Sequence, residues 1–110
     1  MQLLVFVLNK VDRLEDLLKE LLNVGIKGAT VLESTGMARV LHDAIPIFGS
    51  LKMLVNQGYS YSKTVFVVLK DDQVKLAIDS LKQVVGDLYK PDVGILFTIP
   101  LNQVEGGNFS

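Results

Sequence analysis

The feature that most limits the fold of this chain is a set of apolar segments that lack a polar face. The segments QLLVFVL (2–8), KTVFVVLK (63–70) and GILFTI (94–99) are rich in β-branched and aromatic residues, which favours strands. An antiparallel sheet with one face in water normally alternates apolar and polar residues. Here both alternating sets are apolar: Leu3, Val5 and Val7 against Leu4, Phe6 and Leu8; Val65, Val67 and Leu69 against Phe66 and Val68; and Ile95, Phe97 and Ile99 against Leu96.

Two other segments have the periodicity of amphipathic helices. In residues 12–25, Asp12 and Glu15 have the spacing of a capping box, and Glu15 precedes Lys19 by four residues. Gly25 stands where a helix C-cap belongs. The predicted buried stripes are Leu14, Leu17, Leu18, Leu21 and Leu22 in the first helix, and Val74, Ala77, Ile78, Leu81, Val84 and Val85 in a second helix that follows Asp71-Asp72 and ends at Gly86.

The order of these elements predicts the fold class. With a further strand at 27–35, the chain runs strand, helix, strand, long insert, strand, helix, strand. This is the α+β ferredoxin-like βαββαβ pattern, in which an antiparallel four-stranded sheet carries both helices on one face. The 110 residues are expected to form a single domain, 1–110, with an insert at 38–62.

Composition excludes several classes of function. The chain has no cysteine, and His42 is its one histidine, so disulfides and cysteine- or histidine-based metal sites are not expected. The 11 basic and 12 acidic residues nearly balance, which leaves no electrostatic footprint for nucleic acid or anionic lipid. The apolar run at 3–8 is too short to span a membrane and lacks the layout of a signal peptide. We therefore expect a soluble, cytoplasmic protein that binds no nucleic acid and does not insert into membranes.

The two apolar strand faces predict an assembly of several copies. Two helices cover only one face of such a sheet, and the other would expose roughly several hundred Å² of apolar surface, more than a monomer usually shows. Hydrophobic residues make up 49% of the chain, which is high for a small soluble monomer. We expect an obligate homo-oligomer. The alternative is that the insert folds back over the open face.

Several segments together resemble the nitrogen-regulatory P-II signalling proteins of the P-II/CutA superfamily. RLEDLLKELLNVGIKGATVLESTGMAR (13–39) is similar to the family's first helix, its V-G-I-x-G-x-T-V strand and the turn that leads into its mobile T-loop. VFVVLKDDQVKLAIDSL (65–81) is similar to the third strand and second helix, and GDLYKPDVGILFTIPL (86–101) to the B-loop and the strand after it. The resemblance covers nearly the whole chain except residues 40–62.

The resemblance implies a ferredoxin-like homotrimer whose sheets face inward and whose three inter-subunit clefts bind a small-molecule effector. Matched position by position, it implies ligand-binding roles for the strand threonine, the base of the T-loop and the B-loop. Glycines there would let backbone N–H groups approach phosphate oxygens, and an arginine or lysine would add charge-assisted hydrogen bonds. The residues are Thr30, Gly36, Met37, Ala38 and Arg39, together with Gly86, Asp87, Leu88 and Lys90.

The ligand implied by the resemblance is an adenine nucleotide: AMP, ADP, ATP or a cyclic form. The chain departs from the family where positive charge is expected. Val40 follows the T-loop arginine in place of a glutamine, Ile95 stands at the position of the B-loop lysine, and residues 101–110 contain no basic residue. A triphosphate needs several positive charges, so AMP, a cyclic nucleotide, a dinucleotide or a small anion is easier to accommodate.

Structural interpretations of the same residues stay open. Gly36 can be a simple turn residue, and Gly86 can simply cap its helix. Arg39 can form an ion pair within its loop with Glu33 or Asp43. The charged side chains of the B-loop can be solvated and without a further role.

The insert at 38–62 is apolar, unlike a free effector loop. Pro46 fits a helix start and Gly58 a helix stop, and the apolar residues between them have helical spacing, so a short helix is predicted at about 46–57. We expect it to pack within the assembly or to bind a protein partner, such as a regulated enzyme or transporter. The expected partner-binding residues are Ile47, Phe48, Leu51 and Tyr59.

Two functions follow from these observations. The first is a P-II-like signal-transduction protein that binds a small ligand and regulates a protein partner through the insert. The second is a CutA-like structural or interaction trimer without a nucleotide site. An enzyme is not expected, because the sequence offers no nucleophile–base pair, metal-ligand set or suitably spaced carboxylate pair.

Overall fold

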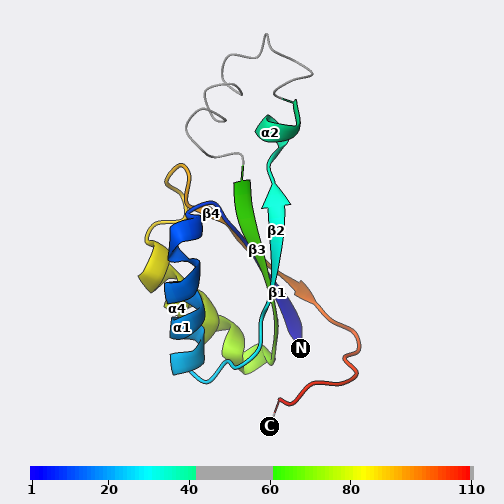
Figure 1. Cartoon of the computed structure of the whole chain (residues 1–110). Coiled ribbons are helices and arrows are strands. Elements are labelled where there is room, and N and C mark those ends of the chain that lie inside the picture. The colour runs from blue at the N-terminus through cyan, green and yellow to red at the C-terminus, as the bar shows by residue number, and fades with distance from the viewer. Residues whose placement is uncertain (42–60, 110) are drawn as a thin grey trace.

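A four-stranded sheet with two helices on one face forms the body of the molecule (Figure 1). The computed structural model describes residues 1–41 and 61–109. In chain order, the elements are β1 (Gln2–Leu8), the 3-10 helix η1 (Val11–Arg13), α1 (Leu14–Asn23), β2 (Thr30–Thr35), α2 (Met37–Leu41), β3 (Tyr61–Leu69), the 3-10 helix η2 (Asp71–Gln73), α4 (Val74–Val85) and β4 (Gly94–Pro100).

The sheet has the strand order β2-β3-β1-β4, and every neighbouring pair is antiparallel. β1 therefore lies in the interior of the sheet, where Val5 is opposite Phe66 of β3 on one side and Phe97 of β4 on the other. This arrangement confirms the predicted α+β ferredoxin-like fold. The predicted trimer stays a prediction, because the structure contains a single chain.

The hydrophobic core lies between the sheet and the two helices. Leu4, Phe6 and Leu8 of β1 point toward the helices and are completely buried. Complete burial of a leucine or phenylalanine side chain contributes about 1.5–3 kcal/mol, so this layer is a main source of stability. The largest fully buried side chains are Phe6, Leu4, Leu8, Leu17, Leu21, Leu69, Leu81, Val65, Val67 and Val93.

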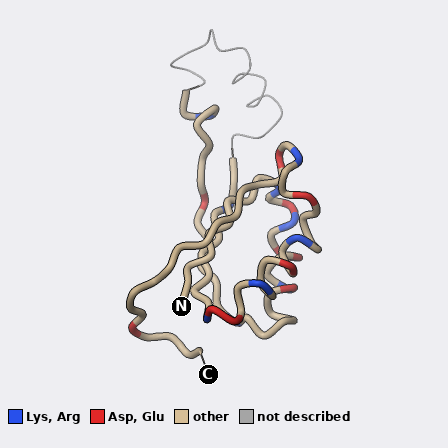
Figure 2. The backbone as a smooth tube through the Cα atoms, turned by 180° about the vertical axis from the view of Figure 1, so that it is seen from behind, with Lys and Arg blue, Asp and Glu red and all other residues tan. Residues whose placement is uncertain are grey.

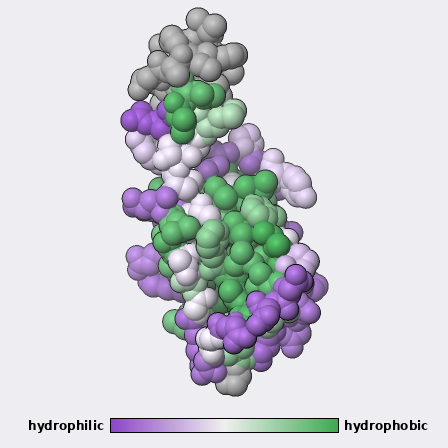
Figure 3. Space-filling view, turned by 90° about the vertical axis from the view of Figure 1, so that its right-hand side faces the viewer, coloured by the Kyte–Doolittle hydropathy of each residue, from purple (hydrophilic) through white to green (hydrophobic). Residues whose placement is uncertain are grey.

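The opposite face of the sheet, here called the open face, is also apolar. Ile95, Phe97 and Ile99 of β4 are 61%, 43% and 44% exposed, although they lie beside apolar residues of β1. Figure 3 shows hydrophobic side chains gathered over this side of the sheet, and Figure 2 shows that charged residues lie mostly on the helices and loops. The predicted excess of apolar strand residues is confirmed for the described part of the chain. The apolar members of the open face are Leu3, Val5, Val7, Leu32, Phe66, Val68, Ile95, Phe97 and Ile99.

The starts of the helices differ from the prediction. The capping box expected from Asp12 and Glu15 is wrong, because the N-cap of α1 is Arg13 and no side chain caps it. A 3-10 turn leads into the helix instead. Two other local predictions are confirmed: the ammonium of Lys19 lies 3.1 Å from the carboxylate of Glu15, and Gly25 ends the helix with a φ of +89°.

Two strand boundaries also differ. The second strand was predicted to begin at residue 27 but begins at Thr30, because residues 27–29 have separated from β3. β3 begins at Tyr61, two residues earlier than predicted. The short helix α2 was not predicted. The helix predicted at about 46–57 lies outside the described residues, and so do Ile47, Phe48, Leu51 and Tyr59. None of the described helices is long and apolar enough to cross a membrane.

Candidate functional site

The predicted ligand residues fall into two groups that occupy different parts of the chain. The first group follows β2: Thr30 is the first residue of that strand, and Gly36 comes directly after its end. At about 3.3 Å per residue, the strand separates Thr30 from Thr35 by about 17 Å. Thr30 therefore lies at one end of β2 and Arg39 beyond the other, so the two do not contact one small ligand within a single chain.

The turn after β2 is a single helical turn. The carbonyl oxygen of Gly36 accepts the N–H groups of Arg39 and Val40 at 3.1 and 3.2 Å, which starts α2. Ala38 is buried, whereas Met37 is 68% exposed. The glycine and the arginine are thus held in fixed relation by backbone hydrogen bonds, with the arginine side chain on the surface.

Among the described residues, Arg39 contacts an aromatic ring. Its guanidinium carbon lies 5.4 Å from the centre of the Tyr61 ring, within the range of a cation–π contact. The ion pair considered with Glu33 is not present; the Glu33 carboxylate pairs instead with Lys63 on the neighbouring strand, from which it accepts a hydrogen bond. That hydrogen bond lowers the pKa of Glu33, and the charge of Lys63 lowers it further. Asp43, the other acidic residue considered, lies outside the described residues.

The second group is the loop between α4 and β4. Gly86 ends α4 with a φ of +83°, and its N–H donates to the carbonyl of Lys82 at 2.8 Å, so its capping role is confirmed. The Asp87 carboxylate accepts the N–H of Tyr89 at 2.9 Å, which fixes the turn. Leu88 packs against the core, and Lys90 is exposed.

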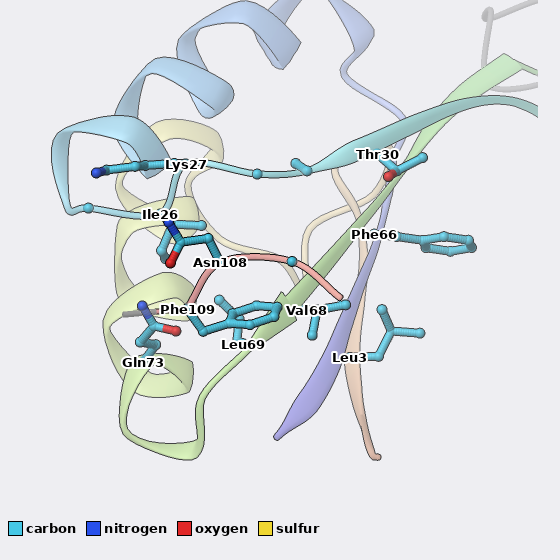
Figure 4. A pocket seen from close by; sticks show the side chains of 14 residues that line it. Leu3, Ile26, Lys27, Thr30, Phe66, Val68, Leu69, Gln73, Asn108 and Phe109 are labelled. Atoms are coloured by element: carbon cyan, nitrogen blue, oxygen red, sulfur yellow. The ribbon is translucent and has the colours of Figure 1, made fainter. Parts of the chain in front are cut away.

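A cavity of about 670 Å³ lies at the other end of the sheet (Figure 4). Of the predicted ligand residues, only Thr30 lines it. Its other walls were not predicted; most come from the connection at 25–29, the end of β3 and the C-terminal segment. The glycine pair Gly106-Gly107 was the one local signal, because adjacent glycines mark a chain reversal. The residues that line the cavity are Leu3, Gly25, Ile26, Lys27, Gly28, Ala29, Thr30, Phe66, Val68, Leu69, Gln73, Gly107, Asn108 and Phe109.

Metal-binding groups are also limited. Within residues 1–41 and 61–109, no cluster of three or more histidine, aspartate or glutamate side chains is placed to hold a metal ion. The acidic side chains at the candidate positions already have partners, as Glu33 and Asp87 show. The polar chemistry that these two groups offer includes Arg39, Lys90, the Thr30 hydroxyl and backbone N–H groups.

Comparison with solved structures finds the same fold. The chain is similar to the crystal structure of Arabidopsis thaliana PII bound to citrate, with a TM-score of 0.64 and 18% sequence identity. The similarity covers 91% of this chain and 73% of that one. No protein-family model and no curated protein matches the sequence. At this identity the comparison establishes the fold, which is the fold that the resemblance to P-II proteins implies.

Proposed function

We propose that the protein is a cytoplasmic P-II-like signalling protein, which assembles as a homotrimer and binds a small ligand at the clefts between subunits. The observation that carries this proposal is the apolar open face in a chain with this fold. Phe97 lies on the same face as apolar residues of β1 and β3, and contiguous exposed apolar patches of this kind mark interaction sites. Three sheets that face inward would bury the open face of every copy.

Assembly would also complete the ligand site. Within one chain, Arg39 follows β2, while Lys90 lies in the loop before β4. In the proposed trimer, the turn at 36–39, the loop at 86–93 and the segment near Thr30 form the walls of a cleft between neighbouring copies. Two cations suit a ligand with few phosphates, so AMP or a cyclic nucleotide is favoured over ATP. The citrate in the PII structure also supports a small anion as ligand.

The ligand would act through the insert at 38–62. Arg39 stands at the start of this insert and Tyr61 near its end, and the two side chains are in contact. A ligand that draws the guanidinium away from the ring favours a different state of the insert. Differential affinity for two such states is sufficient for regulation of a protein partner, such as an enzyme or transporter.

Isothermal titration calorimetry with AMP, cyclic AMP, ADP, ATP and citrate tests the ligand site. Charge-assisted hydrogen bonds contribute about 1.5–3 kcal/mol, so Arg39→Ala is expected to weaken binding by about tenfold or more. Lys82→Ala is the matched control, because it removes one exposed positive charge from α4. The proposal is wrong if no ligand gives heat, or if the two variants bind equally well.

A CutA-like trimer without a nucleotide site is the second candidate. It is favoured by the absence of basic residues at 101–110 and by the contact of Arg39 with an aromatic ring. In that case sedimentation detects a trimer, while calorimetry detects no nucleotide binding.

A further inference from the structure

The end of the β2–β3 ladder, here called the stem, comprises residues 33–35 and 61–63, and α2 begins just beyond it (Figure 1). Tyr61 belongs to the last pair of this ladder. In the preceding pair, on the open face, the hydroxyl oxygens of Ser34 and Ser62 lie 2.6 Å apart. Such a cross-strand hydrogen bond holds the two strands in register, so the Tyr61 ring stands on a fixed base.

The ring attracts the Arg39 side chain through charge. The guanidinium carbon lies 5.4 Å from the centre of the Tyr61 ring, and the attraction arises because the face of an aromatic ring is negative. The acidic residue of the stem, Glu33, is already paired with Lys63. Arg39 and Tyr61 are both exposed, Tyr61 by 54%, so a ligand in solution can reach their contact.

An anion bound to Arg39 would weaken the contact with the ring. A guanidinium that is paired with a carboxylate or phosphate group has no net charge, and the attraction of the ring depends on that charge. Coupling between two binding events is reciprocal, so a contact that the ligand weakens must weaken ligand binding by the same factor. The aromatic ring and an anionic ligand are therefore competitors for one guanidinium.

We propose that Tyr61 is an autoinhibitory residue, whose ring competes with the anionic ligand for Arg39 and raises the ligand concentration at which the protein responds. This inference rests on the proposed function, because Arg39 belongs to the ligand site proposed above. A cation–π contact at an exposed site changes an equilibrium constant by about two- to fivefold. The ring thus sets a threshold for binding and does not block it.

Isothermal titration calorimetry of the full-length protein with citrate and with AMP measures the competition. Tyr61→Leu removes the ring, so it is expected to bind both anions about two- to fivefold more tightly than the wild type. Tyr61→Phe is the matched control, because it keeps an aromatic face and should bind like the wild type. Equal binding by Tyr61→Leu would overturn the proposal. Weaker binding would overturn it too, since the ring would then position the arginine for its ligand.

The arginine side-chain signals in nuclear magnetic resonance provide a second readout. The chain has two arginines, and Arg13 is an internal reference, because it donates a hydrogen bond to the carbonyl of Val84 at 3.1 Å. The ring current of Tyr61 should shift the Nε–H signal of Arg39 in the wild type and in Tyr61→Phe, but not in Tyr61→Leu. Saturating citrate should remove this shift from the wild type. A shift that persists in the citrate-bound protein would contradict the competition.

A double-mutant cycle connects the effect of the ring to the guanidinium. In an Arg39→Ala background, Tyr61→Leu should no longer change the affinity for citrate or AMP. If it still does, the ring acts through another group and the proposal is wrong. If neither anion binds the wild type or Tyr61→Leu, the proposed function fails, and the competition fails with it. If both anions bind and the ring has no effect on affinity, only the role of Tyr61 is wrong.

Discussion

Replacement of Phe97 by aspartate tests whether the open face is an interface. Phe97 lies opposite Val5 near the middle of the open face and is 43% exposed in the single chain. A whole phenylalanine side chain has about 200 Å² of surface, so roughly 85 Å² is available for burial. At about 25 cal/mol per Å², this burial contributes about 2 kcal/mol per copy and about 6 kcal/mol for a trimer. Three buried carboxylates would add several kcal/mol each.

Because 1.4 kcal/mol corresponds to a tenfold change in an equilibrium constant, Phe97→Asp should lower the trimerisation constant by more than about four orders of magnitude. Sedimentation velocity at micromolar concentration measures the change. The matched control is Leu76→Asp, which introduces the same charge at a 46% exposed position of α4. The argument is refuted if the wild-type chain sediments as a folded monomer, or if both variants remain trimeric.

Three further results are expected. Gly94→Ala should destabilise the fold by about 2–5 kcal/mol in urea denaturation. A β-carbon at this position would lie 2.4 Å from the carbonyl oxygen of Val7, and the backbone φ is +151°. An unchanged midpoint would contradict this contact. Phe6→Ala should cost about 3–5 kcal/mol in the same assay, since the side chain is completely buried; a loss below 1 kcal/mol would mean that the core is packed differently. The hydrogen bond from Lys63 lowers the pKa of Glu33, so the stabilising effect of this pair should be full above pH 4.5 and disappear as pH falls through the lowered pKa. Thermal unfolding of Glu33→Gln should therefore show a weaker loss of stability between about pH 5 and pH 3 than the wild type. Identical pH profiles would argue against this pair.

The sheet could be predicted because its signal is local. Alternating side chains in β1 showed that both faces are apolar, although periodicity alone could not say which set faces the helices. That choice depends on how α1 and α4 pack, and they bury Leu4, Phe6 and Leu8. Gly25 and Gly86 were also predictable, because a helix that ends in a left-handed residue favours glycine.

The missed features depend on contacts between residues far apart in the sequence. Asp71 was expected to act at a helix start, but its carboxylate also accepts a hydrogen bond from the N-terminal ammonium at 3.1 Å, which lowers its pKa. The partner of Arg39 lies across the insert, at Tyr61. The cavity brings together Phe66 and Phe109. The Gly106-Gly107 pair indicates a chain reversal, but it does not indicate that the reversal returns the C-terminal segment to this end of β3.

The position of β1 in the sheet has a consequence for synthesis of the chain. Gln2 pairs with Leu69 on one side and with Pro100 on the other, so β1 receives its last partner only after β2, β3 and both long helices have been synthesised. Until then, a segment with apolar residues on both faces has unpaired edges, the condition that favours aggregation during folding. Expression at lower temperature, or with additional chaperones, should therefore raise the soluble yield more than changes to the surface of the folded protein.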